Sequence, residues 1–170
     1  MRNTGFSLLE MLTALAVAAV LTLIAIPLID ELLARQRTST ALRSFTDSLK
    51  YARTHAVLHQ TGVTMRAQQQ DDWGAGWLVF EDPNHNARHD SEEKTLLQRI
   101  PGEGLVIRGN RPVSSYIHFN MLGEPQLTGG GFQAGTVTIC SPHAPEKHSQ
   151  LIMARSGRLR LSSKIASSCP

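Results

Sequence analysis

The chain has 170 residues and a formal net charge of +3, from 17 Lys and Arg side chains against 14 Asp and Glu. A charge this close to balance predicts no class of partner by itself. The length leaves room for one globular domain of about 110 to 140 residues beside a long terminal helix. No nucleophile elbow, phosphate loop or metalloprotease pattern is present, so we expect neither enzymatic activity nor a cofactor.

The first element in chain order is an apolar segment behind a short leader. Residues 1–5 contain one cation, Arg2, and are too few for a secretory leader, and no small-residue cleavage site follows the apolar segment. The run from Met11 to Ile29 carries no charge. With the residues just before it, the run is long enough to cross about 30 Å of hydrocarbon as a helix. We expect residues 6–29 to form a retained transmembrane and assembly helix.

One carboxylate, Glu10, lies near the start of this segment. A buried acid is costly in lipid unless a partner neutralises it. Cleavage between Gly5 and Phe6 would leave a positive α-amino group on Phe6, and Glu10 of an adjacent subunit could meet that group in a staggered helical bundle. The alternative is an ordinary signal anchor that happens to contain a Glu.

Gly5, Phe6, Glu10 and the apolar run together resemble the class III signal of type IV pilins and pseudopilins. The resemblance implies cleavage after Gly5 by a prepilin peptidase, N-methylation of Phe6 and assembly with other pilins through the N-terminal helix. It also implies a single-pass protein in the inner membrane before assembly, and an extracellular one in the pilus afterwards.

The helix is predicted to continue in amphipathic form over residues 30–61, with a bend at Pro27. An apolar stripe at spacings of three and four supports this continuation: Leu42, Phe45, Leu49, Ala52 and Ala56. From residue 62 the pattern changes to short β-like runs separated by Gly, Pro and Asn. We predict strands at Val63–Ala67, Gly76–Glu81, Thr95–Ile100, Leu105–Arg108, Tyr116–Asn120, Thr136–Cys140, Leu151–Ala154 and Arg158–Leu161.

The predicted fold class is therefore α+β, with a long N-terminal helix packed on an antiparallel β domain over residues 62–170. The segments 51–57 and 73–80, followed by Asp82, Asn84 and Asn86, resemble the GspH/FimT/FimU group of minor pilins and pseudopilins. This resemblance covers essentially the whole chain and is strongest to FimT. It implies a type IV pilin fold, a place near the tip of a pilus or pseudopilus, and no enzymatic activity.

The two cysteines, Cys140 and Cys169, lie in the part of the chain that would be exported. In an oxidising compartment we expect a disulfide that ties the C-terminus back to the domain, with a stabilisation of about 3 kcal/mol in the chain-entropy model. Two free thiols are the alternative.

A basic cluster near the C-terminus is the best candidate for a ligand surface. If the chain turns at Gly157, Arg158 and Arg160 project from one face of a strand, and their planar guanidinium groups suit phosphates. The sequence of residues 157–160 also resembles the Gly-Arg-x-Arg motif of FimT proteins, which implies DNA binding for uptake in natural transformation. The predicted DNA-binding residues are Arg155, Gly157, Arg158, Arg160 and Lys164.

The alternative for this cluster is a solvated basic strand edge that blunts aggregation. No aromatic residue is interleaved with the cations, so we expect contacts to backbone phosphates without sequence preference rather than base stacking. Such binding should be micromolar at best and should weaken steeply with salt.

An acidic segment that begins at residue 82 places oxygens at some of the positions of a calcium loop. Ala87 stands where such a loop needs glycine, and strands flank the segment. We therefore expect a polar hairpin loop and no metal site, with calcium as a weak alternative. The candidate calcium ligands are Asp82, Asn84, Asn86, Asp90 and Glu93.

The leading hypothesis is a minor type IV pilin that binds extracellular DNA, without sequence preference, through the basic C-terminal strand. The second is a structural priming or tip pilin, like FimU, without DNA binding. The third is a pseudopilin of type II secretion, like GspH.

Overall fold

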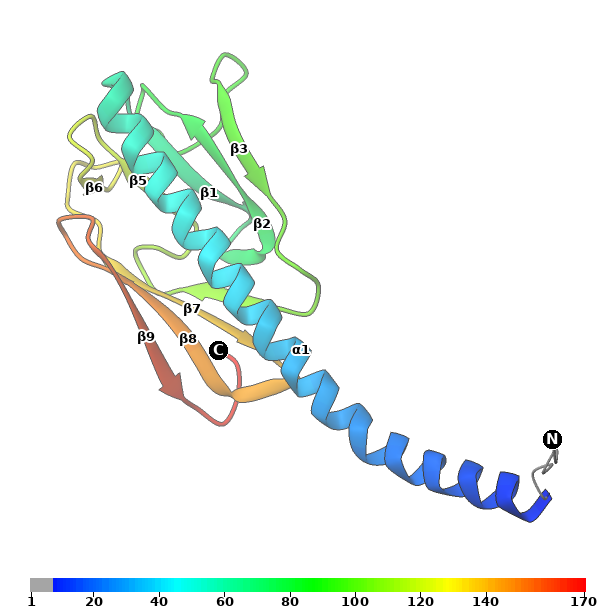
Figure 1. Ribbon diagram of the computed structural model, residues 1–170. Helices are drawn as coiled ribbons and strands as arrows, with labels where there is room; N and C mark the ends of the chain where they lie inside the picture. The colour runs from blue at the N-terminus through cyan, green and yellow to red at the C-terminus, as the bar shows by residue number, and fades with distance from the viewer. Residues whose placement is uncertain (1–7) are drawn as a thin grey trace.

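The computed structural model describes residues 8–170 and, within them, all side chains except those of residues 24, 25, 27, 28, 145 and 146. Its first element is one continuous helix of 52 residues, α1 (Leu8–His59). Figure 1 shows α1 projecting far beyond the rest of the molecule at its N-terminal end and bending before it reaches the sheets. The long helix predicted from the sequence is thus confirmed.

The N-terminal half of α1 carries exposed apolar side chains, among them Leu8, Leu15 and Leu23. In the part of the chain that the structure describes, no helix is long and apolar enough to cross a membrane. The boundaries predicted at residues 5 and 29 remain predictions, and Gly5 and Phe6 lie outside the described residues.

The strands follow the helix in sequence. They are β1 (Val63–Gln69), β2 (Asp72–Glu81), β3 (Thr95–Arg99), β4 (Val106–Gly109), β5 (Tyr116–Phe119), β6 (Pro125–Gln126), β7 (Gly135–Ser141), β8 (Ala144–Met153) and β9 (Leu159–Ile165). They form two antiparallel sheets, ordered β3-β2-β1-β5-β6 and β4-β7-β8-β9. The C-terminal half of α1 contacts both sheets, at β1, β2 and β5 of the first and at β7 and β8 of the second (Figure 1).

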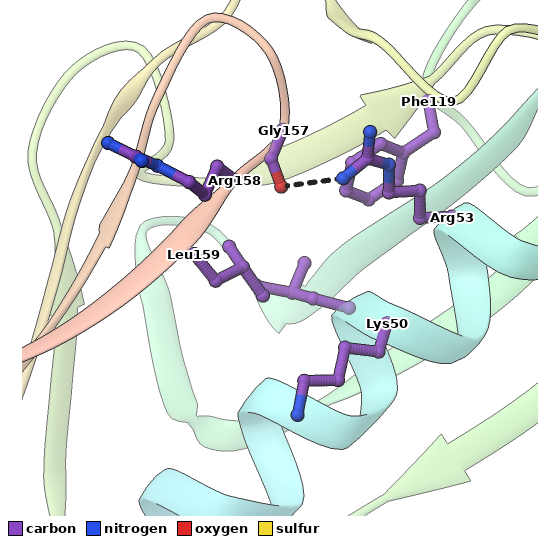
Figure 2. Close-up of a pocket in the computed structure, with 7 residues that line it drawn as sticks. Lys50, Arg53, Phe119, Gly157, Arg158 and Leu159 are labelled. Carbon is purple, nitrogen blue, oxygen red and sulfur yellow. Dashed lines mark hydrogen bonds between the residues drawn. The ribbon is translucent and has the colours of Figure 1, made fainter.

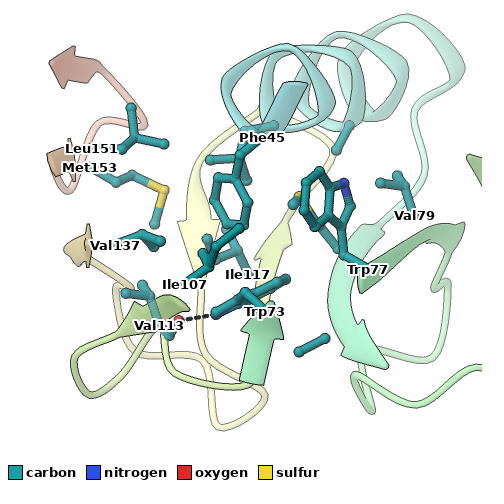
Figure 3. Close-up of a cluster of buried hydrophobic side chains, with 14 of the residues drawn as sticks. Phe45, Trp73, Trp77, Val79, Ile107, Val113, Ile117, Val137, Leu151 and Met153 are labelled. Carbon is teal, nitrogen blue, oxygen red and sulfur yellow. Dashed lines mark hydrogen bonds between the residues drawn. The ribbon is translucent and has the colours of Figure 1, made fainter. Parts of the chain in front are cut away.

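The core lies between α1 and the two sheets. Phe45 of α1 meets both tryptophans of β2, with ring centroids 5.1 Å from Trp73 and 5.1 Å from Trp77 in edge arrangements (Figure 3). The Trp77 indole N–H donates to the Ser48 hydroxyl at 2.9 Å, and the Trp73 indole N–H donates to the carbonyl of Val113 at 3.1 Å. Both tryptophans are therefore packing residues with satisfied polar atoms.

Three parts of the β domain differ from the prediction. The β1–β2 hairpin is longer than expected, because Gln69 pairs with Asp72 beyond a bulge, so β2 begins at Asp72 rather than at Gly76. β8 and β9 are longer than expected, because the polar residues 147–150 and 162–164 pair with each other on adjacent strands despite their lack of apolar alternation. β6 was not predicted, and the glycine-rich segment after it forms a hydrogen-bonded turn, with the Gly130 N–H donating to the Leu127 carbonyl at 2.8 Å. β8 pairs with the next strand of the chain and β6 with the strand before it, so backbone pairing rather than apolar alternation decides these two features.

Candidate nucleic-acid interface

The basic cluster lies where β8 turns into β9. The Ala154 N–H donates to the carbonyl of Arg158 at 2.9 Å, and the Gly157 N–H donates to the carbonyl of Ala154 at 2.9 Å. Gly157 has a φ of +73°, the left-handed conformation that glycine adopts without strain. The turn therefore lies where the sequence predicted it.

Arg53 of α1 holds this turn against the helix. Its guanidinium group donates to the carbonyl oxygen of Ser156 at 3.1 Å and to that of Gly157 at 3.2 Å. Figure 2 shows the hydrogen bond to Gly157. A Cβ added at Gly157 would lie 3.2 Å from Arg53 Cζ and 3.2 Å from the carbonyl oxygen of Gly123. The sequence offered no signal for this anchor, since Arg53 reads simply as a cation on the polar side of an amphipathic helix.

Three of the predicted DNA-binding cations alternate along β9 and the residue before it. Leu159 is half-buried against the core, so its neighbours Arg158 and Arg160 project from the opposite face of the sheet. Figure 2 shows the Arg158 side chain extending away from α1. Lys164 is on the same face as Arg160 and pairs in register with His148 of β8. All three cations are exposed, and among the described side chains none forms an ion pair with an acid.

Arg155 is placed differently from these three cations. Its guanidinium carbon lies 3.7 Å from the ring centroid of Phe132, which precedes β7 and is 55% exposed. No aromatic residue is interleaved with the cations in the sequence, but the fold brings Phe132 beside Arg155, which weakens the argument against base stacking. The contact joins residues from different strands, so a search for aromatics along the basic segment alone could not find it.

A pocket of about 240 Å³ separates the turn from α1 (Figure 2). Leu49, Phe119 and Leu159 supply its apolar lining, and Lys50 and Arg158 are among its polar lining residues. Lys50 thus adds a cation from the helix to the same region of the surface as the turn.

The acidic segment that follows β2 is held mainly by hydrogen bonds within itself, although the buried Oε1 atom of Glu93 has no hydrogen-bond partner among the described residues. Asp82 is buried and accepts hydrogen bonds from Thr64 and from the backbone N–H groups of Asn86 and Ala87. Burial raises the pKa of Asp82, but the hydrogen bonds from His118 and Thr64 outweigh that effect, so the net pKa is lowered.

The oxygens of the remaining calcium candidates accept hydrogen bonds from within the loop: Asn84 Oδ1 from the Asn86 N–H, Asn86 Oδ1 from the Arg88 N–H, and Glu93 Oε2 from the Asp90 N–H. The side-chain amides of Asn84 and Asn86 donate to Asp90 at 2.9 and 2.8 Å, and these hydrogen bonds lower the pKa of Asp90. Glu93 has a raised pKa, first because of burial and then because Asp82 and Asp90 repel its charge. In the described residues the acids of this loop do not converge as a set of three metal ligands. The geometry is that of a polar hairpin loop.

The other predicted residues lie away from this surface. The structure contains the expected disulfide between Cys140 and Cys169, with the two Cα atoms 5.9 Å apart. Glu10 lies in the first turn of α1, far along the helix from the β domain (Figure 1). The structure therefore separates the assembly segment from the basic surface.

Comparison with known proteins shows the same fold in two solved structures. The type IV minor pilin FimU of Pseudomonas aeruginosa has 20% sequence identity and a TM-score of 0.61, covering 80% of this chain and 97% of that one. The minor pseudopilin EpsH from the type 2 secretion system of Vibrio cholerae has 16% identity and a TM-score of 0.54, covering 75% of this chain and 97% of that one. No curated protein matches the sequence.

Two family models match the sequence. The prokaryotic N-terminal methylation motif matches residues 1–26, and the type II transport protein GspH model matches residues 41–157, which is more than half of the chain. The methylation motif implies processing by a prepilin peptidase, assembly with other pilins and inner-membrane anchoring before assembly. The chain belongs to the GspH family of minor pilins and pseudopilins, with the type IV pilin fold.

Proposed function

We propose that this chain is a minor type IV pilin that binds extracellular DNA for uptake in natural transformation. The observation that carries the proposal is the row formed by Arg158, Arg160 and Lys164, which share one exposed face and lack acidic partners among the described side chains. Free guanidinium groups in a row match the spacing and charge of a phosphate backbone. Arg155 and Lys50 extend the positive surface on either side of the turn.

The acidic loop after β2 supports the proposal, because it lies on a different sheet from the cations and would orient an approaching nucleic acid. It lies at the end of β2 in the first sheet, whereas the cations lie on β9 at the edge of the second sheet. A nucleic acid is attracted to one edge of the domain and repelled from the other, which orients the encounter. The fibre needs only weak binding by each subunit if several copies are presented.

Processing and assembly form the other half of the proposal. Cleavage after Gly5 leaves Phe6 as the methylated N-terminus, and Glu10 of one subunit neutralises the new amine of its neighbour. The match of residues 1–26 to the methylation motif supports this assignment. Residues 6–29 then serve first as the membrane anchor and later as the packing segment of the fibre.

The test is DNA binding by the full chain in detergent micelles, measured by fluorescence anisotropy with a labelled oligonucleotide. Replacing Arg158 and Arg160 together by Gln should weaken binding at low salt and reduce the slope of log K against log salt by about 1.5 to 2, because two phosphate contacts are lost. The control replaces two exposed arginines away from β9, Arg88 in the acidic loop and Arg99 at the end of β3, and should retain the wild-type affinity and slope.

Unchanged binding by the Arg158→Gln/Arg160→Gln variant, with folding intact, would refute the DNA assignment. The chain would then be a structural pilin or a pseudopilin. The genes adjacent to its own would separate a pilus system from a secretion system.

A further inference from the structure

A histidine, His148, lies beside the Cys140–Cys169 disulfide, although a structural crosslink needs no such neighbour. Cys140 lies on β7 at the bulge between Ile139 and Ser141, and His148 of β8 lies beside it. Cys169 comes from the C-terminal tail, which turns back after β9 toward β8 (Figure 1). A ring nitrogen of His148 and the sulfur atoms of both cysteines all lie within 4.8 Å of one another.

His148 is buried, with 5% of its surface exposed, and its Nε2 atom has no hydrogen-bond partner. Leaving a buried polar atom unpaired costs about 1 to 3 kcal/mol, so native proteins rarely do it without a functional reason. His148 and the two cysteines form one small cluster. A metal ion bound there would give a ring nitrogen of the buried histidine a partner.

Two thiolates and one neutral imidazole are a preferred ligand set for Zn²⁺. In a tetrahedral site with Zn–S bonds of about 2.3 Å, the two sulfur atoms lie roughly 3.8 Å apart. Cys140 and His148 are held by paired strands, whereas Cys169 lies beyond the end of β9 and can move to reach that separation.

We propose that the reduced chain binds one Zn²⁺ through Cys140 Sγ, Cys169 Sγ and a ring nitrogen of His148, with water as the fourth ligand. A dithiol reductant supplies two electrons and two protons to the disulfide and becomes a disulfide itself. Zn²⁺ then displaces both thiol protons into solvent. In the reverse direction a disulfide oxidant accepts two electrons from the thiolates and two protons from solvent, and its own S–S bond breaks to give a dithiol. The Cys140–Cys169 bond forms again and Zn²⁺ leaves.

The metal would hold the C-terminal tail over the outer face of the second sheet while the cysteines are reduced, as in a newly exported chain. Zinc and the disulfide therefore exclude each other but tether the same two segments. This inference does not depend on DNA binding, because none of the three ligands belongs to the proposed DNA contacts.

Cobalt is the probe, because Co²⁺ takes the same ligands as Zn²⁺ and its thiolate complexes absorb light. The full chain in detergent, reduced with a phosphine, should bind one equivalent of Co²⁺ with a thiolate-to-cobalt charge-transfer band, and Zn²⁺ should abolish that band. The oxidised chain should give none. His148→Ala should weaken cobalt binding at least tenfold, while His143→Ala, at an exposed histidine of the turn between β7 and β8, should not.

Alkylation of the reduced wild-type chain gives a second readout that needs no variant to fold. Zn²⁺ should slow the reaction of both thiols with iodoacetamide by at least tenfold. The proposal is overturned if reduced wild-type protein shows no charge-transfer band, if Zn²⁺ leaves the alkylation rate unchanged, or if a folded His148→Ala variant binds Co²⁺ as tightly as wild type.

Discussion

The Arg53 guanidinium group of α1 donates a hydrogen bond to the carbonyl oxygen of Gly157 at 3.2 Å, across 104 positions of sequence. A second hydrogen bond, to Ser156 at 3.1 Å, fixes the direction of the guanidinium plane. The turn that carries the proposed DNA contacts is therefore held by the same helix that carries the assembly segment. This link joins the turn of the basic cluster directly to α1.

Replacing Arg53 by Met should lower the free energy of unfolding by about 1 to 2 kcal/mol, because two charge-assisted hydrogen bonds are lost while the apolar stem remains. Chemical denaturation of the full chain in detergent measures the change. Arg43→Met is the control, since Arg43 is exposed on the same helix and should change the stability by less than about 0.5 kcal/mol. Equal losses in the two variants would contradict a specific role for Arg53.

Replacing Gly157 by Ala should destabilise the chain more than the same change at Gly104. Both glycines have a φ of +73°, so both substitutions carry the conformational penalty of a left-handed residue, about 1 kcal/mol. At Gly157 the new methyl group also meets Arg53 Cζ and the Gly123 carbonyl at 3.2 Å, whereas at Gly104 it meets nothing within 4 Å. Thermal melts of the two variants would separate crowding from backbone strain, and identical melting temperatures would show that the turn can relax.

The sequence predicted the features that depend on local patterns. The apolar spacing around Phe45 and Leu49 predicted the buried stripe of α1, and the pair Ser156-Gly157 predicted the turn. Both signals are local, because helix periodicity and turn chemistry act over a few residues. The disulfide could be predicted because the chain has two cysteines, Cys140 and Cys169, in the part expected to be exported.

The contacts that define the surface could not be predicted in the same way. Arg53 meets Gly157, and Arg155 meets Phe132, only because β9 lies beside β8 and the segment before β7 reaches their turn. Strand order is set by packing over the whole domain, and a single sequence does not report it. The buried position of His148 was hidden for the same reason, since its neighbours on β8 are polar.

Asp82 should make stability depend on pH in the acidic range. Its pKa is lowered in the folded chain, so its ionised form stabilises the fold above its unfolded pKa of about 3.9. That contribution is lost as the pH falls from about 4 through the folded pKa. Asp82→Asn should therefore be less stable than wild type at pH 7, and the difference between the two should shrink toward pH 3.

Denaturation curves collected at several values of pH measure this difference in the free energy of unfolding. Asp47→Asn is the control, because Asp47 is exposed on α1 and its loss should leave the pH profile of wild type unchanged. A difference between Asp82→Asn and wild type that stays constant from pH 7 to pH 3 would contradict the role of the ionised carboxylate. Because Asp82 also organises the backbone of the following loop, hydrogen exchange at Asn86 and Ala87 should accelerate in the variant.

Phe132 should give the proposed DNA surface a preference for single strands. Its ring is half exposed beside Arg155, so an unpaired base can stack on the uncovered part, whereas the bases of a duplex are already stacked on each other. Phe132→Leu should weaken binding of labelled oligothymidylate about fivefold or more, since base stacking on an aromatic side chain contributes about 1 to 3 kcal/mol. Duplex binding and the salt slope should change little, because the phosphate contacts stay in place.

Tyr51→Leu, at an exposed aromatic of α1, is the matched control and should bind both forms like wild type. Equal weakening for single and double strands would mean that Phe132 acts only by holding Arg155, and the preference for single strands would be refuted.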